Sequence, residues 1–471
     1  MRRPAGRALL AAAGAALLAC PAAAQVALGA DVNPRAVWSS PPEQFTLRVV
    51  ATGLQDPAEV TWGPDEHLWI TERIGKRVVR VNPADGSRTV AVTIDEVLQT
   101  LAQDGLQGLA LHPDLLRGSN FVYVMYTYDA DPGAGAERRA KIRRYAYDAR
   151  AQQLRDPVDV LTGIPHGPDH GASRIAIGPD GKLYASTGDH GSNFLAYYCA
   201  PIRAQELPAA ADVQARDWRS YEGKILRLNL DGSIPDDNPV LNGVRSHVWS
   251  YGHRNPQGMA FGPDGSLYAA EHGQDTDDEV NRIEAGRNYG WPLIAGYKDD
   301  RYYTYANWSA SAPTPCASLT YGRDVPSTVP RTKESDVEPP DFTPPLKTFF
   351  TVPSTYDVRA LGNATAALAG LDVYASPAIP GWSPSILVAG LASGAIYRIP
   401  LPVTQAPPLT YFKAQERYRD LAIAPDGRRI YVVTDDGGRT VTATGEPTAD
   451  LAHPGALLEL TYTGTGAARQ P

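Results

Sequence analysis

Cysteine is scarce in this sequence, which has three in 471 residues: Cys20, Cys199 and Cys316. None belongs to a Cys-x-x-Cys or Cys-x-x-Cys-His motif, which excludes a c-type haem attachment site and a cluster of thiolate metal ligands. In an oxidising compartment Cys199 and Cys316 could form a disulfide. Two buried free thiols are an equally open alternative.

Long apolar segments are lacking beyond residues 1–25. No later stretch approaches the roughly 20 apolar residues of a membrane-spanning helix. Residues 1–24 place arginines ahead of an apolar run that ends in small residues, which is typical of an export signal. Cleavage after Ala24 predicts a free periplasmic or secreted protein. Cleavage at Cys20 would instead leave a lipid anchor, but Leu18 fits a lipoprotein signal poorly.

An excess of positive charge and helical periodicity are missing as well. The formal net charge is −8, which argues against a nucleic-acid-binding surface. No long stretch repeats apolar residues at helical spacing, whereas glycine (43 residues) and proline (41 residues) are frequent. Many short strands joined by tight turns have this composition, so the sequence predicts an all-β protein.

A short unit recurs along the chain: an apolar strand, a turn that usually contains Pro-Asp, and a returning strand. The copies start at Val60, Leu109, Ile175, Met259, Leu421 and, in a weaker form, Trp382. Each copy predicts a β-hairpin. Six hairpins with further strands between them predict a six-bladed β-propeller of four-stranded antiparallel sheets.

The predicted propeller covers residues 44–463, between an N-terminal segment at 25–43 and a disordered tail at 464–471. The patterns FTLRVVATG and GALLELTYTG near the two ends both resemble strands, and we expect them to share one blade and close the ring. The interval between the hairpin prolines Pro263 and Pro384 is long. It predicts insertions that form loops over one face, where sites are common.

The most specific pattern begins at Ser246 and reads SHVWSYGHRNPQGMAFGPDGSLYAAEHGQDTDDEVNRIEAGRNYGWPLIAGYKDD. Together with LAQDGLQGLALHPD, PDHGASRIAIGPDGKLYASTGDHG, KILRLNLDGSIPDDNP and ERYRDLAIAPDG, it resembles the soluble quinoprotein glucose dehydrogenases. The resemblance runs from about Gln44 to Tyr462, and its motifs are long and keep their order. It implies a six-bladed propeller with pyrroloquinoline quinone (PQQ) and calcium as cofactors.

The resemblance gives a role to a histidine that alone would be an ordinary polar loop residue. The family's catalytic base falls on His170, and Asp169 beside it is implied to orient the ring and raise its basicity. Arg254 is implied to stabilise the oxyanion at the reacting carbonyl. The implied PQQ contacts are Gln103, His170, Arg254, Asn255, Arg417 and Arg419. Three guanidinium groups suit a ligand with three carboxylates.

Calcium ligands are implied at two places. The family's catalytic calcium is bound partly by two successive carbonyls, which fall on Gly273 and Gln274; the family usually has proline at the second position. A pair of calcium ions beside the family's dimer interface has ligands that map to Glu279, Tyr289, Ala295, Asp299 and Glu334. Clustered oxygen donors suit calcium, so the resemblance implies a homodimer with calcium at its interface.

Two departures from the family concern the cofactor and the substrate. Ala392 stands where the family has a lysine that contacts PQQ, which removes one cationic contact. The segment YDVRALGNATAALAGLDVY is shorter than the family's loop and lacks its sugar-stacking tryptophan, with Asn363 the nearest equivalent. The preferred sugar is therefore left open.

The resulting hypothesis is a periplasmic PQQ-dependent dehydrogenase that oxidises the anomeric hydroxyl of an aldose to a lactone. Because the chain has no haem motif, electrons must pass to an external quinone or cytochrome. Two alternatives stay open at this stage: a calcium-stabilised propeller that binds a sugar or a partner without redox chemistry, and a calcium-dependent lactonase.

Overall fold

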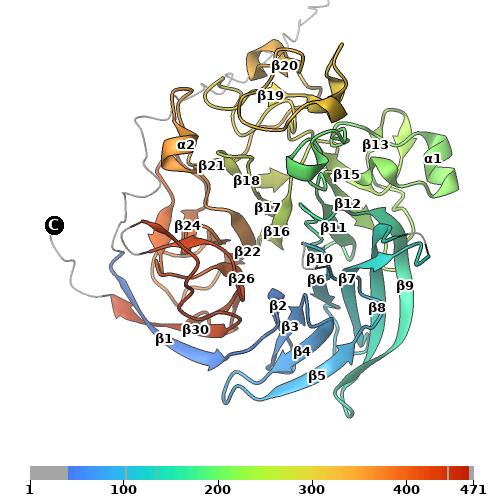
Figure 1. The fold of residues 1–471 in the computed structure, drawn as a ribbon. Helices are drawn as coiled ribbons and strands as arrows, with labels where there is room; N and C mark the ends of the chain where they lie inside the picture. Colours follow the sequence, from blue (N-terminus) through green and yellow to red (C-terminus); the bar gives the residue numbers. More distant parts are fainter. Residues whose placement is uncertain (1–40, 101–102, 134, 443–444, 466–471) are drawn as a thin grey trace, which may run out of the picture. The chain divides into compact units, whose positions relative to one another are not determined.

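The polypeptide forms a ring of sheets around a central axis (Figure 1). The computed structural model describes residues 41–100, 103–133, 135–442 and 445–465. Within these residues six four-stranded antiparallel sheets follow one another, which confirms the predicted propeller. The predicted export signal and Cys20 lie outside the described residues.

Each of the first five blades takes four strands in chain order, starting from the axis. The first two blades are β2 (Pro57–Trp62), β3 (Leu68–Glu72), β4 (Arg77–Val81) and β5 (Arg88–Thr93), then β6 (Leu106–Leu111), β7 (Phe121–Asp129), β8 (Arg138–Asp148) and β9 (Gln153–Pro165). The third and fourth are β10 (Ile175–Ile177), β11 (Leu183–Thr187), β12 (Lys224–Leu228) and β15 (Val248–Tyr251), then β16 (Pro256–Phe261), β17 (Leu267–Glu271), β18 (Asp278–Ile283) and β21 (Lys347–Phe349). The fifth is β22 (Leu368–Tyr374), β23 (Ser385–Gly390), β24 (Ala395–Pro400) and β25 (Leu409–Tyr411).

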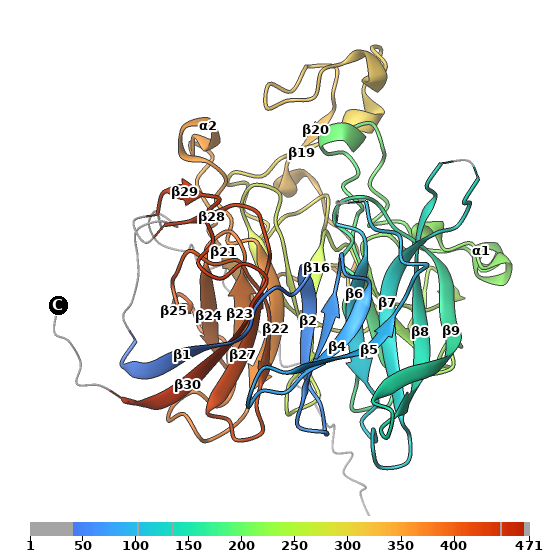
Figure 2. The ribbon, with the colours of Figure 1, turned by 60° about the horizontal axis from the view of Figure 1, so that its bottom comes forward.

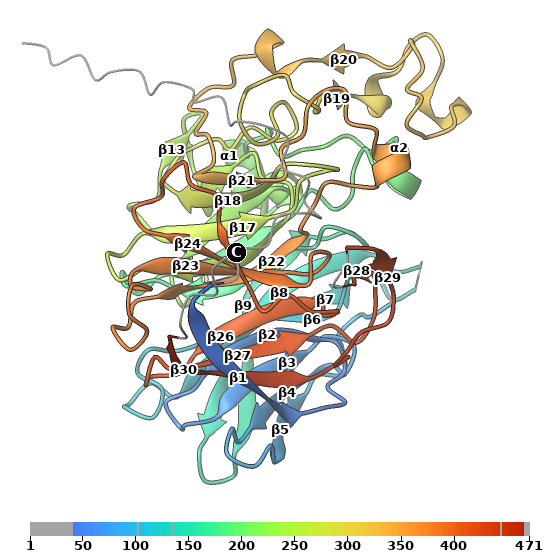
Figure 3. The ribbon, with the colours of Figure 1, turned by 90° about the vertical axis from the view of Figure 1, so that its left-hand side faces the viewer.

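The sixth blade joins the two ends of the chain, as the sequence predicted. Its order from the axis is β26 (Tyr418–Ile423), β27 (Arg429–Thr434), β30 (Leu457–Thr465) and β1 (Glu43–Ala51). Blue β1 and red β30 lie side by side in Figure 3. In their antiparallel register Phe45 pairs with Tyr462. Since β30 continues to Thr465, residues 464 and 465 belong to a strand and not to the predicted tail.

The hairpin turns lie where the Pro-Asp units predicted them in five blades. In the first, the Gly63 amide donates to the His67 carbonyl at 2.8 Å, and Gly178 makes the same bond to Lys182 at 2.8 Å in the third. The weak sixth copy differs. Pro384 directly precedes β23, because the strand that pairs with β23 on the axis side is β22, which lies upstream of a longer loop.

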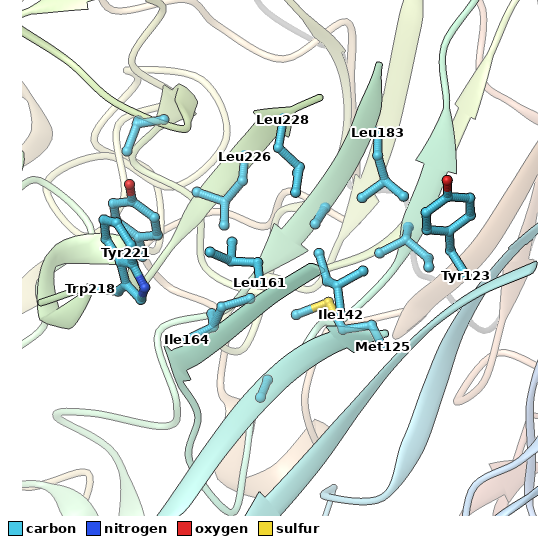
Figure 4. Packing of buried hydrophobic residues seen from close by; sticks show 14 of the residues in the cluster. Tyr123, Met125, Ile142, Leu161, Ile164, Leu183, Trp218, Tyr221, Leu226 and Leu228 are labelled. Carbon is cyan, nitrogen blue, oxygen red and sulfur yellow. The ribbon is translucent and has the colours of Figure 1, made fainter. Parts of the chain in front are cut away.

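Apolar layers between neighbouring blades hold the ring together. Figure 4 shows one such layer, in which Met125 and Ile142 of the second blade pack against Leu183 and Leu226 of the third. All four side chains are fully buried. Burying each one contributes about 1.5–3 kcal/mol. The layers make the ring a rigid support for the loops at its ends.

The predicted insertion lies between β18 and β21 and stands above one face of the ring (Figure 2). It contains β19 (Tyr305–Ala306), β20 (Arg331–Thr332), and the 3-10 helices η3 (Trp308–Ala310), η4 (Cys316–Ser318) and η5 (Glu334–Asp336). A disulfide joins Cys316 to Cys199, so the pairing that the sequence left open is present.

Short elements complete the loops. They are β13 (Val240–Leu241), β14 (Val244–Arg245), β28 (Thr440–Val441), β29 (Pro447–Thr448), α1 (Ala210–Ala215), α2 (Val358–Leu361), η1 (Leu195–Tyr197) and η2 (Arg219–Tyr221). Among the described residues, none of the helices has the length and apolar character that a membrane crossing requires.

Candidate active site

A cavity of about 640 Å³ opens among loops that all six blades contribute. Its charged lining combines four arginines, Arg73, Arg174, Arg417 and Arg419, with five carboxylates, Asp56, Glu59, Asp169, Asp435 and Asp436. The predicted residues Gln103 and Asp169 also line it. The arginines among the lining residues are the donors that suit carboxylate groups of a ligand.

His170 lies in the loop between β9 and β10, on backbone with a φ of 46°. Its Nδ1 is 2.6 Å from Oδ1 of Asp189, and its Nε2 is 3.2 Å from Nη2 of Arg254. A guanidinium group can only donate, so Nε2 is the acceptor and Nδ1 carries the proton. A lone pair on Nε2 is what a general base requires.

We expected Asp169 to orient the His170 ring, but a different carboxylate contacts the ring. Asp169 accepts a hydrogen bond from the backbone amide of His170 at 2.9 Å, and its carboxylate is 3.9 Å from Nε2. Asp189 makes the bond to the ring because β11 ends directly beneath the loop. A Cβ on Gly188 would lie 1.8 Å from the His170 carbonyl oxygen, so only glycine permits this approach.

Asp189 is a site residue that sequence reasoning missed. It is fully buried, and Nε1 of Trp291 donates to its Oδ2 at 2.8 Å. Burial opposes its ionisation, but the interaction with His170 and the charge of Arg254 hold the pKa of Asp189 below its usual value. The sequence signal was the Gly-Asp pair after a hairpin strand, in STGDHG.

Arg254 and Asn255 directly precede β16. Arg254 donates from its backbone amide to Glu271 at 2.8 Å and from Nη1 to the His272 carbonyl at 3.1 Å. Its guanidinium carbon lies 5.4 Å from the centre of the Trp291 ring. Asn255 accepts from the Ala172 amide at 3.2 Å through its side-chain oxygen.

Several buried polar atoms of the site have no hydrogen-bond partner among the described residues. They are Nε of Arg254, Nδ2 of Asn255, Nε2 of His272 and Oε1 of Gln107. Unpaired buried polar atoms are costly and rare in native proteins. Gln107 and His272 line the cavity itself, so a polar ligand there would satisfy groups that the chain leaves unpaired.

Arg417 and Arg419 share one buried carboxylate, which the sequence did not identify. Nε of Arg417 is 3.0 Å from Oδ2 of Asp435, and Nε of Arg419 is 2.7 Å from Oδ1. Burial opposes ionisation of Asp435, but the two guanidinium groups hold its pKa below the usual value. Asp435 thus fixes both arginines at the cavity wall.

Comparisons with known proteins agree with this geometry. A family model described as glucose/sorbosone dehydrogenase matches residues 54–320 and 349–442. The chain is 42% identical over 440 residues to quinoprotein glucose dehydrogenase B of Acinetobacter calcoaceticus, covering 89% of this chain and 91% of the relative.

The chain belongs to the glucose/sorbosone dehydrogenase family.

More distant relatives agree. The chain is 29% identical over 269 residues to an aldose sugar dehydrogenase of Escherichia coli, covering 55% of this chain and 64% of the relative. The PQQ-bound aldose sugar dehydrogenase of Streptomyces coelicolor superimposes with a TM-score of 0.60 at 28% identity, covering 90% of this chain and all of the other. As a member of this family, the chain is an oxidoreductase of the sugar dehydrogenase class.

Two of the three carboxylates expected to bind interface calcium, Glu279 and Glu334, accept hydrogen bonds from backbone amides. Glu334 accepts from Ala295 at 3.0 Å and from Asp300 at 2.9 Å, and Glu279 accepts from Gly296 at 2.6 Å. Over the residues with described positions, no three His, Cys, Asp or Glu side chains are arranged to hold a metal.

The pKa values of these two carboxylates are both raised. Burial, together with neighbouring carboxylates, raises the pKa of Glu334 to about 7 and that of Glu279 well above its usual value. The carbonyls expected to bind catalytic calcium lie in the loop between β17 and β18. Gly273 and Gln274 are both half-buried there, and the Gly273 amide donates to Asp278 at 2.8 Å.

Ala392 and Asn363, the two positions at which this chain departs from the family, both lie close to charged side chains. Ala392 lies in the turn between β23 and β24, and the Lys413 ammonium donates to the carbonyl of the next residue, Ser393. Burial lowers the pKa of Lys413 to about 8. Asn363 accepts a hydrogen bond from Nη2 of Arg323, which belongs to the insertion, at 3.0 Å.

Proposed function

We propose that this protein is a PQQ-dependent dehydrogenase that oxidises the anomeric hydroxyl of an aldose to a lactone. The observation that carries the proposal is the chain of contacts from Trp291 through Asp189 and His170 to Arg254, beside a cavity with arginine side chains. It combines a neutral base, a group that orients it and a cation at one place.

The cavity fits the cofactor chemically. PQQ is a planar quinone with three carboxylates, and the lining arginines offer planar donor forks to such groups. The unpaired atoms of Arg254, Asn255 and His272 are further polar groups that a bound quinone could satisfy. When bound, PQQ supplies the carbonyl that accepts a hydride from the anomeric carbon.

The protein's own residues accept the proton and stabilise the resulting charge. Nε2 of His170 takes the proton of the anomeric hydroxyl, while Asp189 keeps Nδ1 protonated and stabilises the charge that the ring gains. Arg254 lies within 3.2 Å of the same Nε2, so its charge is next to the reacting atoms. Its guanidinium group can stabilise negative charge that develops on an oxygen there.

Calcium is the second cofactor of the proposal. We assign the catalytic ion to the carbonyls of Gly273 and Gln274, and the interface ions to Glu279, Asp299 and Glu334 with the carbonyls of Tyr289 and Ala295. Oxygen donors of these kinds are what calcium requires. Burial and neighbouring carboxylates raise the pKa of the Glu279 and Glu334 carboxyls, so a bound cation there would stabilise their ionised forms.

The proposal also covers the location, the oligomeric state and the electron acceptor of the enzyme. We infer a periplasmic or secreted homodimer that passes electrons to an external quinone or cytochrome, because the sequence has no haem attachment motif. The lactone leaves after two electrons and two protons have been removed from the aldose.

Reconstitution tests the proposal. The full mature chain is loaded with PQQ and calcium and mixed with a panel of aldoses without an electron acceptor. We expect the absorbance of reduced quinone to appear with at least one aldose. PQQ binding without reduction would favour the non-redox binding propeller. Hydrolysis of lactones that requires calcium but not PQQ would favour the lactonase.

A further inference from the structure

Residues 316–324 of the insertion, here called the strap, connect three loops around the cavity. At one end Cys316 is bonded to Cys199, across a sequence separation of 117 residues. At the other end Arg323 bonds to Asp275 at 3.0 Å and to Asn363 at 3.0 Å. These partners follow β11, β17 and β21, so the strap ties together loops of different blades.

The strap holds the loop that follows β11 by several independent contacts. Besides the disulfide, the Tyr198 hydroxyl donates to the Leu319 carbonyl at 2.7 Å. The Tyr321 ring lies 5.6 Å from the Tyr198 ring and 6.1 Å from the Phe194 ring, measured between centroids. In Figure 2 the gold insertion meets the green loop above the ring.

Phe194 is the residue through which these contacts reach the chemistry. Its ring stacks on that of His170, with 5.7 Å between centroids and 26° between planes. The guanidinium carbon of Arg254 lies 6.0 Å from the Phe194 centroid. Tyr321 packs against Phe194 edge to face, at 83°. Phe194 is therefore held between the strap and the catalytic pair.

Asp189 fixes His170 within the plane of the imidazole, through one hydrogen bond. The other edge contact, from Arg254 to Nε2, also lies at the ring's rim, so neither restrains motion of the ring face as a stacked ring does. Proton abstraction depends on where Nε2 points, and small misplacements of a catalytic group lower rates strongly.

We propose that Phe194 is a positioning residue for His170, and that the strap, secured by the Cys199–Cys316 disulfide, keeps Phe194 in place. The proposal rests on the proposed function, because it assigns to His170 the role of base. It adds a residue and a disulfide outside the set of groups that contact the reacting atoms.

The test compares four enzymes loaded with PQQ and calcium: the native chain, Phe194→Leu, the Cys199→Ser/Cys316→Ser pair, and all three substitutions together. The disulfide is removed by serine substitution, and not by a thiol reductant, because thiols also reduce quinones. We expect Phe194→Leu to lower kcat about 10- to 100-fold, with KM and the Kd for PQQ changed less than threefold. The serine pair should lower kcat less, and the combined variant should resemble Phe194→Leu, since both act through one ring.

Conservative variants separate positioning from folding. Phe194→Tyr and Tyr321→Phe keep the rings and should retain most of the turnover, whereas Tyr321→Ala should behave like the serine pair. Arg359→Ala is the matched control, because it removes only the exposed ion pair of Arg359 with strap residue Asp324. If the serine pair does not fold, Tyr321→Ala gives the same comparison.

The outcomes distinguish the two proposals. If the native enzyme reduces no PQQ with any aldose, the proposed function fails. If the native enzyme is active and Phe194→Leu has native kcat, the positioning role of Phe194 is wrong. Strictly additive losses of kcat in the combined variant would show that the disulfide acts elsewhere.

Discussion

Nδ1 of His170 lies 2.6 Å from Oδ1 of Asp189, a residue 19 positions further along the chain. This contact crosses from the loop before β10 to the end of β11. It fixes which ring nitrogen is protonated, and so which nitrogen can act as a base. The carboxylate next to His170 in sequence has a different role, since Asp169 bonds to the backbone.

Asp189→Asn should lower kcat about 10²- to 10⁴-fold, because an amide can donate to Nδ1 and so favour the tautomer with its proton on Nε2. Asp169→Asn is the matched control and should cause a loss at least tenfold smaller. Single-turnover reduction of bound PQQ measures the chemical step directly. Equal losses in the two variants would contradict the assignment of orientation to Asp189.

His170→Ala should lower turnover by about two to four orders of magnitude while PQQ binding stays largely intact. The expectation follows from the position of the ring, which contacts Arg254 and Asp189. Titration of the apo-protein with PQQ and steady-state kinetics on the same preparation provide both readouts. Near-native turnover would remove His170 as the base.

The repeated Pro-Asp hairpins and the matching strand patterns at the two ends were sufficient to predict the propeller and its closure. The loop that holds His170 was also identified, through its resemblance to a family motif that is continuous in sequence. Contacts between blades were not predictable from the sequence. Arg174 bonds to Asp420 at 2.8 Å across 246 residues, and Trp291 bonds to Asp189 across 102. Such pairs depend on how the blades are placed around the axis, which no local pattern specifies.

Asp372 provides a pH-dependent prediction away from the proposed metal sites. It lines a second cavity, of about 740 Å³, and burial together with Asp420 raises its pKa to about 7. A pKa raised on folding gives stability that is present at low pH and lost as pH rises through the folded-state value. Asp372→Asn mimics the protonated form, so its melting temperature should exceed the native one by about one to three degrees at pH 8.5.

At pH 5 the difference in melting temperature should be smaller than at pH 8.5, since Asp372 is still protonated in the native fold there and only the unfolded-state carboxyl has ionised. Differential scanning calorimetry at the two pH values, at constant ionic strength, measures the difference. A native chain that is more stable than the variant at pH 8.5 would show that the ionised carboxylate is stabilised by a partner.

Glu334→Ala should weaken the proposed dimer and lower its thermal stability, but it should leave quinone reduction measurable. The side chain is buried and accepts three backbone hydrogen bonds from the 295–300 loop. Glu338→Ala is the control, because that residue is exposed and forms an ion pair with Lys298 at the surface. Sedimentation velocity in calcium and in chelator measures the association. A native chain that is monomeric in calcium would contradict the dimer.

Ala392→Lys should tighten PQQ binding if the lost lysine of the family is not replaced. A buried charge-assisted contact contributes about 1.5–3 kcal/mol, which is roughly one to two orders of magnitude in affinity. The structure also offers a replacement, since the Lys413 ammonium bonds to the carbonyl of Ser393, next to Ala392. Titrations with PQQ in excess calcium compare the native chain, Ala392→Lys, Lys413→Met and the double variant.

Two patterns of affinity decide between these possibilities. If Lys413 has taken over the role, Lys413→Met weakens binding and Ala392→Lys restores it in the double variant. If it has not, Lys413→Met binds PQQ like the native chain and Ala392→Lys alone binds more tightly. Equal affinities in all four proteins would place residue 392 outside reach of the cofactor. The arginines that line the cavity, Arg417 and Arg419 among them, would then provide its cationic contacts from this side of the ring.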